Sequence, residues 1–262
     1  MCWGRFLEAM SDPIKPFGVD FPLWPALDFS PFGETEVKPL PRLQRFVSAT
    51  LARNWAVIPH VTHHDEADIT DLDHLRQTLN KENPQEKVTL LAFIVKAIVQ
   101  GLKTHPQFNA SLDVSNNTLI YKKYFNIGVA VDTPEGLLVP VIQGCDAKTL
   151  AQISQEVAEI SERARRKGLK MREMSGGSMS VSSLGGIGGT AFTPIVNAPE
   201  LAILGVTKSR WAPRRTKDDQ IEWRLMIPLD LSYDHRAING ADAARFVASL
   251  VTALAEPENL LS

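Results

Sequence analysis

A histidine and an asparagine that could take part in acid–base chemistry stand four positions apart near the end of the chain. His235 follows a strand-like apolar run at residues 225–232 and precedes an amphipathic run at residues 241–255. A side chain at such a junction is held rigidly while its tip stays reachable, and a general base needs both properties. Asn239 can cap the helix and orient the histidine. The alternative is a structural histidine at the end of a strand.

Three serines precede a glycine-rich loop at residues 185–189: Ser180, Ser182 and Ser183. The sequence has no G-x-S-x-G elbow there, so it does not indicate a nucleophilic serine. A hydroxyl at a strand end can still donate a hydrogen bond to a developing oxyanion, although surface serines on an edge strand are the alternative. The loop, GGIGG, matches neither a dinucleotide fingerprint nor a phosphate loop, and it predicts a flexible or closely packed turn.

A cluster of histidine and aspartate side chains at residues 60–68 has the residue types of a metal site. On a strand, His60 and His64 share one face, whereas His63 and Asp65 share the other. No ligand pair at helical spacing and no cysteine accompanies them. We therefore expect no metal here and favour a polar strand in a subunit interface.

The composition is that of an ordinary globular protein. Of 262 residues, 44% are hydrophobic and 22% charged, and the net charge of −2 does not indicate nucleic acid or an anionic membrane as a partner. No apolar run reaches the ~18 residues of a membrane helix, and the N-terminus lacks the pattern of a secretory signal. Two cysteines form neither a disulfide framework nor a zinc site, so we expect a cytoplasmic protein.

The pattern of the chain predicts one α/β domain with a central mixed β-sheet flanked by helices. Residues 1–36, rich in proline and aromatics, predict an extended arm, part of which lies against the body or a neighbouring subunit, and residues 37–262 form the domain. Thr70 is expected to cap one of the helices. Helices are predicted at residues 41–54, from 70 onward, 88–104, from 150 to about 168, and 241–255. Strands are predicted at residues 61–69, 110–114, 119–121, 125–131, 137–142, 179–183, 201–207 and 225–232.

Residues 232–240, SYDHRAING, resemble the S-[FY]-D-H-R-x-x-[DN]-G signature of the dihydrolipoamide acyltransferases. These enzymes form the cores of 2-oxo acid dehydrogenase complexes and are related to chloramphenicol acetyltransferase. Four further stretches resemble the family in the same order and spacing: IPHVT with DIT at 58–62 and 68–70, NIGVAVDTPEGLLVPVI at 126–142, SSLG at 182–185, and FTPIVNAPELAILG at 192–205. The resemblance covers about residues 37–261 and is closest to the acetyltransferases of pyruvate dehydrogenase complexes.

The resemblance implies a reaction and a place for it. His235 would take the proton from a thiol, and Ser182 would donate to the tetrahedral oxyanion that forms when the thiolate attacks a thioester. Most members have aspartate at the position of Asn239, and an amide can hold the site but cannot stabilise an imidazolium by charge. The implied fold is a chloramphenicol-acetyltransferase-like trimer with His235 from one subunit and Ser182 from its neighbour.

The resemblance also implies substrates and partners. Arg76, Thr190 and Thr193 are candidates for coenzyme A contacts by family position, with an exposed helix charge and loop packing as the alternatives. The lipoyl group would come from a missing domain or in trans. The implied partners are the other subunits of a 2-oxo acid dehydrogenase complex, and residues 257–261 resemble the anchor that builds larger cubic cores.

Two other functions compete with the acetyltransferase. A free-standing enzyme like chloramphenicol acetyltransferase would use a hydroxyl acceptor, but the Asp-His-Arg motif at residues 234–236 favours a thiol acceptor. A non-catalytic scaffold subunit is the third possibility, and the presence of both His235 and Ser182 argues against it.

Overall fold

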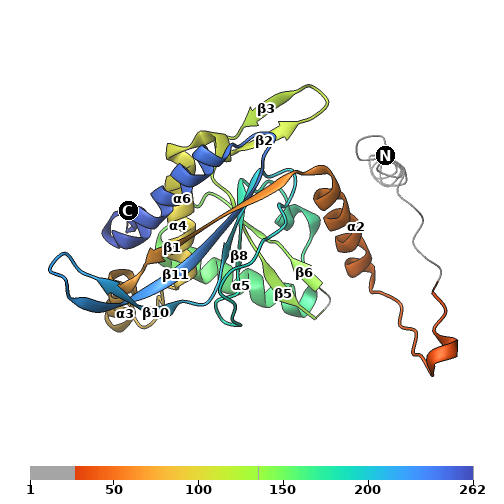
Figure 1. Cartoon of the computed structure of the whole chain (residues 1–262), viewed down its shortest axis with the longest axis horizontal. Coiled ribbons are helices and arrows are strands. Elements are labelled where there is room, and N and C mark those ends of the chain that lie inside the picture. Colours follow the sequence, from red (N-terminus) through yellow and green to blue (C-terminus); the bar gives the residue numbers. More distant parts are fainter. Residues whose placement is uncertain (1–26, 135, 262) are drawn as a thin grey trace.

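The computed structural model describes residues 27–134 and 136–261, and its centre is a mixed β-sheet (Figure 1). Within these residues the sheet has seven strands in the order β1-β11-β9-β8-β4-β7, and β10 pairs with the outer part of β11. Their bounds are β1 His60–Asp68, β4 Ile127–Val129, β7 Val141–Ile142, β8 Met179–Ser183, β9 Ala202–Val206, β10 Arg210–Arg215 and β11 Ile221–Asp234. Strands β4, β8 and β9 run parallel and the other neighbours antiparallel, which confirms the predicted mixed sheet.

Two small ribbons stand apart from this sheet. The first pairs β2 (Ala110–Asp113) with β3 (Thr118–Tyr121), and the second pairs β5 (Val131–Thr133) with β6 (Gly136–Leu138). The sequence predicts single strands at 125–131 and 137–142, and each is split in two. The split follows from pairing, because β4 and β7 join the main sheet while β5 and β6 leave it together.

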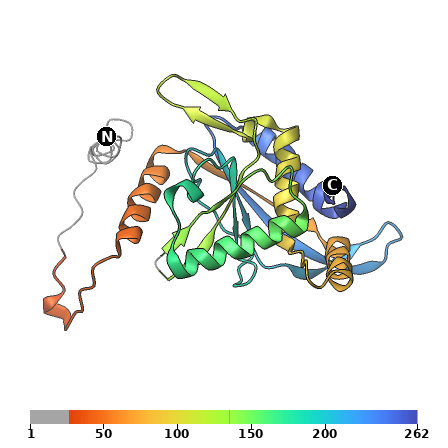
Figure 2. The same ribbon diagram turned by 180° about the vertical axis from the view of Figure 1, so that it is seen from behind.

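Helices cover the apolar face of the sheet (Figures 1 and 2). Helix α4 contacts both α5 and α6, and α6 also packs along β1. Alternate residues of β11, such as Leu229, Leu231 and Tyr233, point into the same cluster as the fully buried Phe93 and Phe246 of these helices. The helix bounds are α2 Arg42–Val57, α3 Thr70–Glu82, α4 Leu90–Thr104, α5 Leu150–Lys167 and α6 Gly240–Ala255.

Short 3₁₀ turns complete the described chain: η2 Ser30–Phe32, η3 Pro106–Phe108, η4 Met171–Met174 and η5 Pro257–Leu260. No helix among the described residues is long and apolar enough to cross a membrane.

The predicted helices are confirmed within a few residues, with one correction at the start of α3. Thr70 does not cap this helix, because it is already its first residue and the cap position belongs to Ile69. The Thr70 hydroxyl instead donates to Asp68 Oδ1 at 2.7 Å and accepts from the Leu225 N–H at 2.8 Å. Thr70 thus links α3 to β11, and this bond between distant segments outweighs the local capping pattern.

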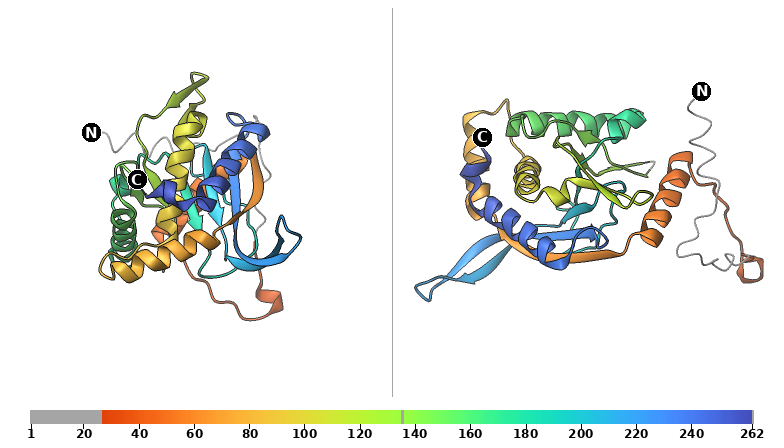
Figure 3. Two further views of the ribbon diagram at one scale, coloured as in Figure 1. Left: turned by 90° about the vertical axis from the view of Figure 1, so that its left-hand side faces the viewer. Right: turned by 90° about the horizontal axis from the view of Figure 1, so that it is seen from above.

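The predicted arm is described only from residue 27. Its remaining part, including Trp3, Phe17, Phe21 and Trp24, lies outside the described residues. Residues 27–41 are exposed and lead to α2, which projects from one end of the molecule (Figure 3). This stretch therefore does not lie against the body of its own chain, and a neighbouring subunit remains the predicted alternative.

Candidate active site

Strand β11 and helix α6 place His235 as the sequence predicts. The strand ends at Asp234, His235 follows it, and α6 begins at Gly240. The backbone of this turn is fixed from two sides: the Asp234 N–H donates to the Leu201 carbonyl at 2.9 Å, and the His235 N–H donates to the Pro59 carbonyl at 3.1 Å. The residue is nevertheless exposed. A rigid backbone with a reachable imidazole suits a general base.

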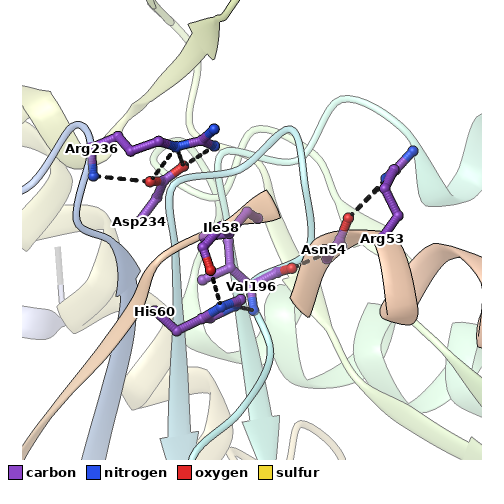
Figure 4. A network of polar contacts seen from close by, with 7 residues as sticks. All are labelled: Arg53, Asn54, Ile58, His60, Val196, Asp234 and Arg236. Atoms are coloured by element: carbon purple, nitrogen blue, oxygen red, sulfur yellow. Dashed lines mark hydrogen bonds and ion pairs between the residues drawn. The ribbon is translucent and has the colours of Figure 1, made fainter. Parts of the chain in front are cut away.

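An ion pair between the buried Asp234 and the partly exposed Arg236 locks the same turn (Figure 4). The Asp234 carboxylate is almost fully buried and accepts from Arg236 Nε at 2.9 Å and from Nη2 at 2.6 Å. The Arg236 backbone N–H adds a third bond to Asp234 Oδ1 at 3.0 Å. Because Arg236 satisfies this carboxylate, the pair stabilises the turn, and among the described residues no hydrogen bond joins the carboxylate to the His235 ring.

Asn239 caps α6, as predicted. Its Oδ1 accepts from the Asp242 N–H at 2.9 Å and its Nδ2 donates to Asp242 Oδ2 at 2.7 Å. Within the described chain these bonds occupy the amide, and no hydrogen bond joins it to His235. The role of Asn239 in orienting the histidine therefore stays a prediction.

Ser182 lies far from His235 in the same chain. It pairs with Gly205 on β9, and Gly205 pairs with Asp230 on β11, five residues before His235. Five residues of strand rise and two strand spacings put the two residues on the order of 20 Å apart. One chain therefore cannot bring both side chains to the same reacting carbonyl.

Ser182 stands on the polar face of the sheet, opposite the helices. Strand alternation puts it on the same face as Asp230 and Ser232. His64 Nδ1 lies 2.6 Å from Asp230 Oδ1, and Thr62 Oγ1 lies 2.7 Å from Ser232 Oγ. His60 and His64 thus share this face, as predicted. No group of three or more His, Cys, Asp or Glu among the described residues could hold a metal ion.

A cavity of about 200 Å³ opens beside the glycine loop at the N-terminal end of α4. Its lining is partly apolar and partly hydroxyl-bearing: Leu90, Leu91, Ile94, Val206 and Ile227, with Ser183, Thr207, Ser209, Gly185 and Gly186. Thr207 is 1% exposed, and its Oγ1 has no hydrogen-bond partner among the described residues. The sequence reasoning missed this cavity, because its walls come from four separate segments.

The glycine loop forms a turn, as predicted. Gly188 and Gly189 have φ values of 147° and 89°, which side-chain-bearing residues rarely adopt. The turn lets the chain pass from β8 to the exposed residues Thr190 and Thr193.

The three predicted coenzyme A contacts are not gathered at the cavity. Arg76, on α3, is bonded to Asp73 Oδ1 through Nε at 3.0 Å and Nη2 at 2.6 Å. Thr190 and Thr193 are exposed in the loop after β8. None of the three lines the cavity, so their role in binding stays a prediction.

Comparison with known proteins identifies the family of the chain and agrees with its fold. The family described as 2-oxoacid dehydrogenases acyltransferase (catalytic domain) matches residues 32–262. The dihydrolipoyllysine-residue acetyltransferase component of the pyruvate dehydrogenase complex from Cupriavidus necator is 56% identical over 225 residues, which are 85% of this chain and 40% of that protein. The corresponding component from Haemophilus influenzae is 48% identical, over 91% of this chain and 42% of that protein.

A solved structure of a related enzyme has the same fold as this chain. The structure comes from crystallographic and enzymatic work on the role of a serine, a histidine and an asparagine in the catalytic mechanism of Azotobacter vinelandii dihydrolipoamide acetyltransferase. It superposes with a TM-score of 0.88 at 48% identity, and covers 92% of this chain and all of that one. A structure of the cubic core of the pyruvate dehydrogenase multienzyme complex gives the same values.

The chain matches one domain of these relatives and not their whole length. The chain spans about two fifths of the length of these curated relatives. Because the family match covers most of the chain, and the fold and the signature agree with it, this chain belongs to the catalytic-domain family of the 2-oxoacid dehydrogenase acyltransferases.

Proposed function

We propose that this chain is the catalytic core of a dihydrolipoamide acetyltransferase, which moves an acetyl group between a dihydrolipoyl thiol and coenzyme A in a pyruvate dehydrogenase-type complex. The observation that carries the proposal is the strand–turn–helix unit that presents His235, with Asn239 four positions later. The histidine and asparagine studied in the A. vinelandii enzyme are also four positions apart.

In the proposed reaction His235 accepts the proton of the attacking thiol. A thiol has a pKa of about 8.5, so few molecules are thiolates at neutral pH and a nearby base speeds the attack. The thiolate adds to the thioester carbonyl, and the Ser182 hydroxyl donates to the oxyanion. Collapse of this intermediate expels the second thiolate, which takes the proton back from His235. One thioester replaces another, so the catalyst has to supply positioning and proton transfer.

We further propose that the site forms between subunits of a trimer. The separation of Ser182 and His235 in one chain supports this, since a neighbouring copy must supply the missing partner. In this arrangement the described part of the arm, residues 27–36, lies on a neighbouring subunit, and the catalytic domain begins at residue 37. The exposure of the described arm residues is consistent with such a contact.

We propose that coenzyme A uses the cavity beside Ser183. Its apolar wall from α4 and its hydroxyl groups suit an extended chain that carries amides. Arg76, Thr190 and Thr193 remain candidates for the outer, charged part of the substrate. The dihydrolipoyl group comes from a further domain or in trans.

We also propose which proteins this core binds, how it assembles further and where in the cell it works. Its partners are the other enzymes of the complex, and further assembly into a cubic core uses residues 257–261. Both reacting thiols must stay reduced, which favours the cytoplasm.

The first test is acetyl transfer from acetyl-coenzyme A to free dihydrolipoamide. We expect His235→Ala to lower kcat by roughly 10²–10⁴-fold, because the general base is lost. His74→Ala, an exposed histidine on α3, is the matched control and should keep the parent rate. Ser182→Ala should cost roughly 10²–10³-fold through loss of the oxyanion donor.

The outcomes separate the competing functions. A parent that assembles but acetylates a hydroxyl acceptor in preference to dihydrolipoamide would point to the chloramphenicol-acetyltransferase-like activity. A parent that assembles and is inactive with both acceptors would contradict the proposal and favour a scaffold.

A further inference from the structure

His60 makes two hydrogen bonds that fix its ring in one chemical form (Figure 4). Its Nδ1 lies 2.9 Å from the Ile58 carbonyl, so Nδ1 carries the proton and donates. Its Nε2 accepts the Val196 N–H at 3.0 Å, which requires Nε2 to be unprotonated. The imidazole is therefore neutral. Burial lowers its pKa, and this effect outweighs the hydrogen bond to the Ile58 carbonyl and the negative charge of Asp234, which both raise the pKa.

The bond to Val196 is part of a clamp on the loop that follows Thr193. The Val196 carbonyl accepts from Asn54 Nδ2 at 3.0 Å, so side chains from either side of the α2–β1 junction hold both polar groups of this residue. Val196 is fully buried, and 136 residues separate it from His60. Trp55 stacks on the His60 ring with centroids 5.6 Å apart, which restricts the ring further.

The same junction holds the turn of the proposed base. Pro59, next to His60, accepts the His235 N–H at 3.1 Å. His60 itself pairs with Asp234 across the sheet. Two adjacent residues thus hold two different segments: the His60 ring binds the loop, and the Pro59 carbonyl binds the turn that carries His235.

We propose that His60 is a positioning residue, which fixes the loop at residues 190–197 relative to the turn that carries His235. This inference rests on the proposed function, because the loop carries Thr190 and Thr193 and the turn carries the base. An imidazole suits the task because it donates at one nitrogen and accepts at the other without charge. A misplacement of about 1 Å at reacting groups can cost ~10²-fold in rate, so a small shift of either segment matters.

The test compares two substitutions at residue 60 in the full chain. His60→Leu removes both bonds, whereas His60→Gln can place an amide oxygen where Nε2 accepts from Val196. We expect the leucine variant to lower kcat by about 10- to 100-fold with the KM for dihydrolipoamide within about twofold of the parent. The glutamine variant should recover most of the loss. His63→Gln, a histidine on the same strand outside the clamp, should keep the parent kcat.

A second measurement does not depend on activity. Hydrogen exchange followed by mass spectrometry should show faster exchange in His60→Leu for peptides that contain Val196 and His235. An inactive parent would contradict the proposed function, and the exchange measurement would still decide whether His60 joins the two segments.

Three results would overturn the inference. The first is an unchanged kcat in His60→Leu. The second is unchanged exchange at both peptides. The third is a loss of kcat that is equal in the leucine and glutamine variants and follows the loss of folded protein, which would leave His60 a purely structural histidine.

Discussion

Among single residues, Glu200 combines almost complete burial with a carboxyl group that is only partly satisfied. Its Oε1 accepts from Asn197 Nδ2 at 3.3 Å, and its Oε2 has no hydrogen-bond partner among the described residues. Lys122 Nζ donates to the neighbouring Gly177 carbonyl at 2.8 Å. Burial raises the pKa of Glu200 to about 7, against the attraction of Lys122 for the charged form. The group therefore titrates near neutral pH, two residues before β9 begins.

This raised pKa predicts a stability change with a definite sign. Since the folded pKa lies above the ordinary value of 4.5, the contribution of Glu200 to stability is fully present below pH 4.5 and is lost as the pH rises through 7. Glu200→Gln cannot ionise. From pH 5 to pH 8 the free energy of unfolding of the parent should fall relative to this variant by about 2–3 kcal/mol. Urea unfolding of both proteins at the two pH values measures the difference, and a constant difference would contradict the prediction.

At the scale of elements, the loop after β8 is fastened to the polar face of the sheet. The Phe192 N–H donates to Asp230 Oδ2 at 3.1 Å, while His64 holds the other carboxylate oxygen. The Phe192 ring lies over Gly205, where an added Cβ would stand 2.7 Å from a ring carbon. The missing side chain at Gly205 thus makes room for the loop.

We therefore predict that Gly205→Ala displaces this loop. The new methyl group would also meet the Asp230 Cβ at 3.2 Å, and such overpacking typically costs about 1–3 kcal/mol. Thermal unfolding should show the loss as a lower Tm. Gly186→Ala is the control, because a Cβ there meets nothing within 4 Å and should change stability by less than about 1 kcal/mol. Equal Tm values for the two variants would disprove the close approach.

The β10–β11 hairpin and helix α2 lie at opposite ends of the molecule (Figures 1 and 3), and both expose apolar side chains. The β10–β11 hairpin presents Trp211 and Trp223, which are 56% and 64% exposed, and strand register puts them on the same face. At the other end α2 presents Phe46 and Trp55. Separate apolar ends fit head-to-tail association better than a two-fold contact, because a two-fold contact buries one patch against itself. This arrangement supports the proposed ring of three subunits.

A mixing experiment tests the shared site at this scale. Ser182→Ala and His235→Ala should each be nearly inactive alone. If both are unfolded and refolded together in equal amounts, random trimers should regain about a quarter of the parent activity, since one interface in four joins an intact histidine to an intact serine. Activity that stays at the level of the separate variants in correctly assembled trimers would show that the site lies within one chain.

Local patterns in the sequence determined most of the elements and the position of His235 between a strand and a helix. A nearly continuous apolar run marked α4, helical spacing marked α5, and Asn239 before an amphipathic run marked the cap of α6. These signals depend on interactions between residues a few positions apart, so they can be read in the chain itself. The family signature around His235 added the function class, because its residue types are tied to one chemistry.

Contacts between distant segments were decided only by the tertiary structure. Thr70 does not cap α3 as expected, and its hydroxyl accepts a hydrogen bond from the Leu225 N–H. The cavity beside Ser183 is lined by segments that are far apart in the chain. The separation of Ser182 from His235 follows from strand order, and the clamp of His60 on Val196 joins residues 136 positions apart. Such pairings depend on how the whole sheet assembles, and hydrophobic spacing or capping within a few residues carries no information about them.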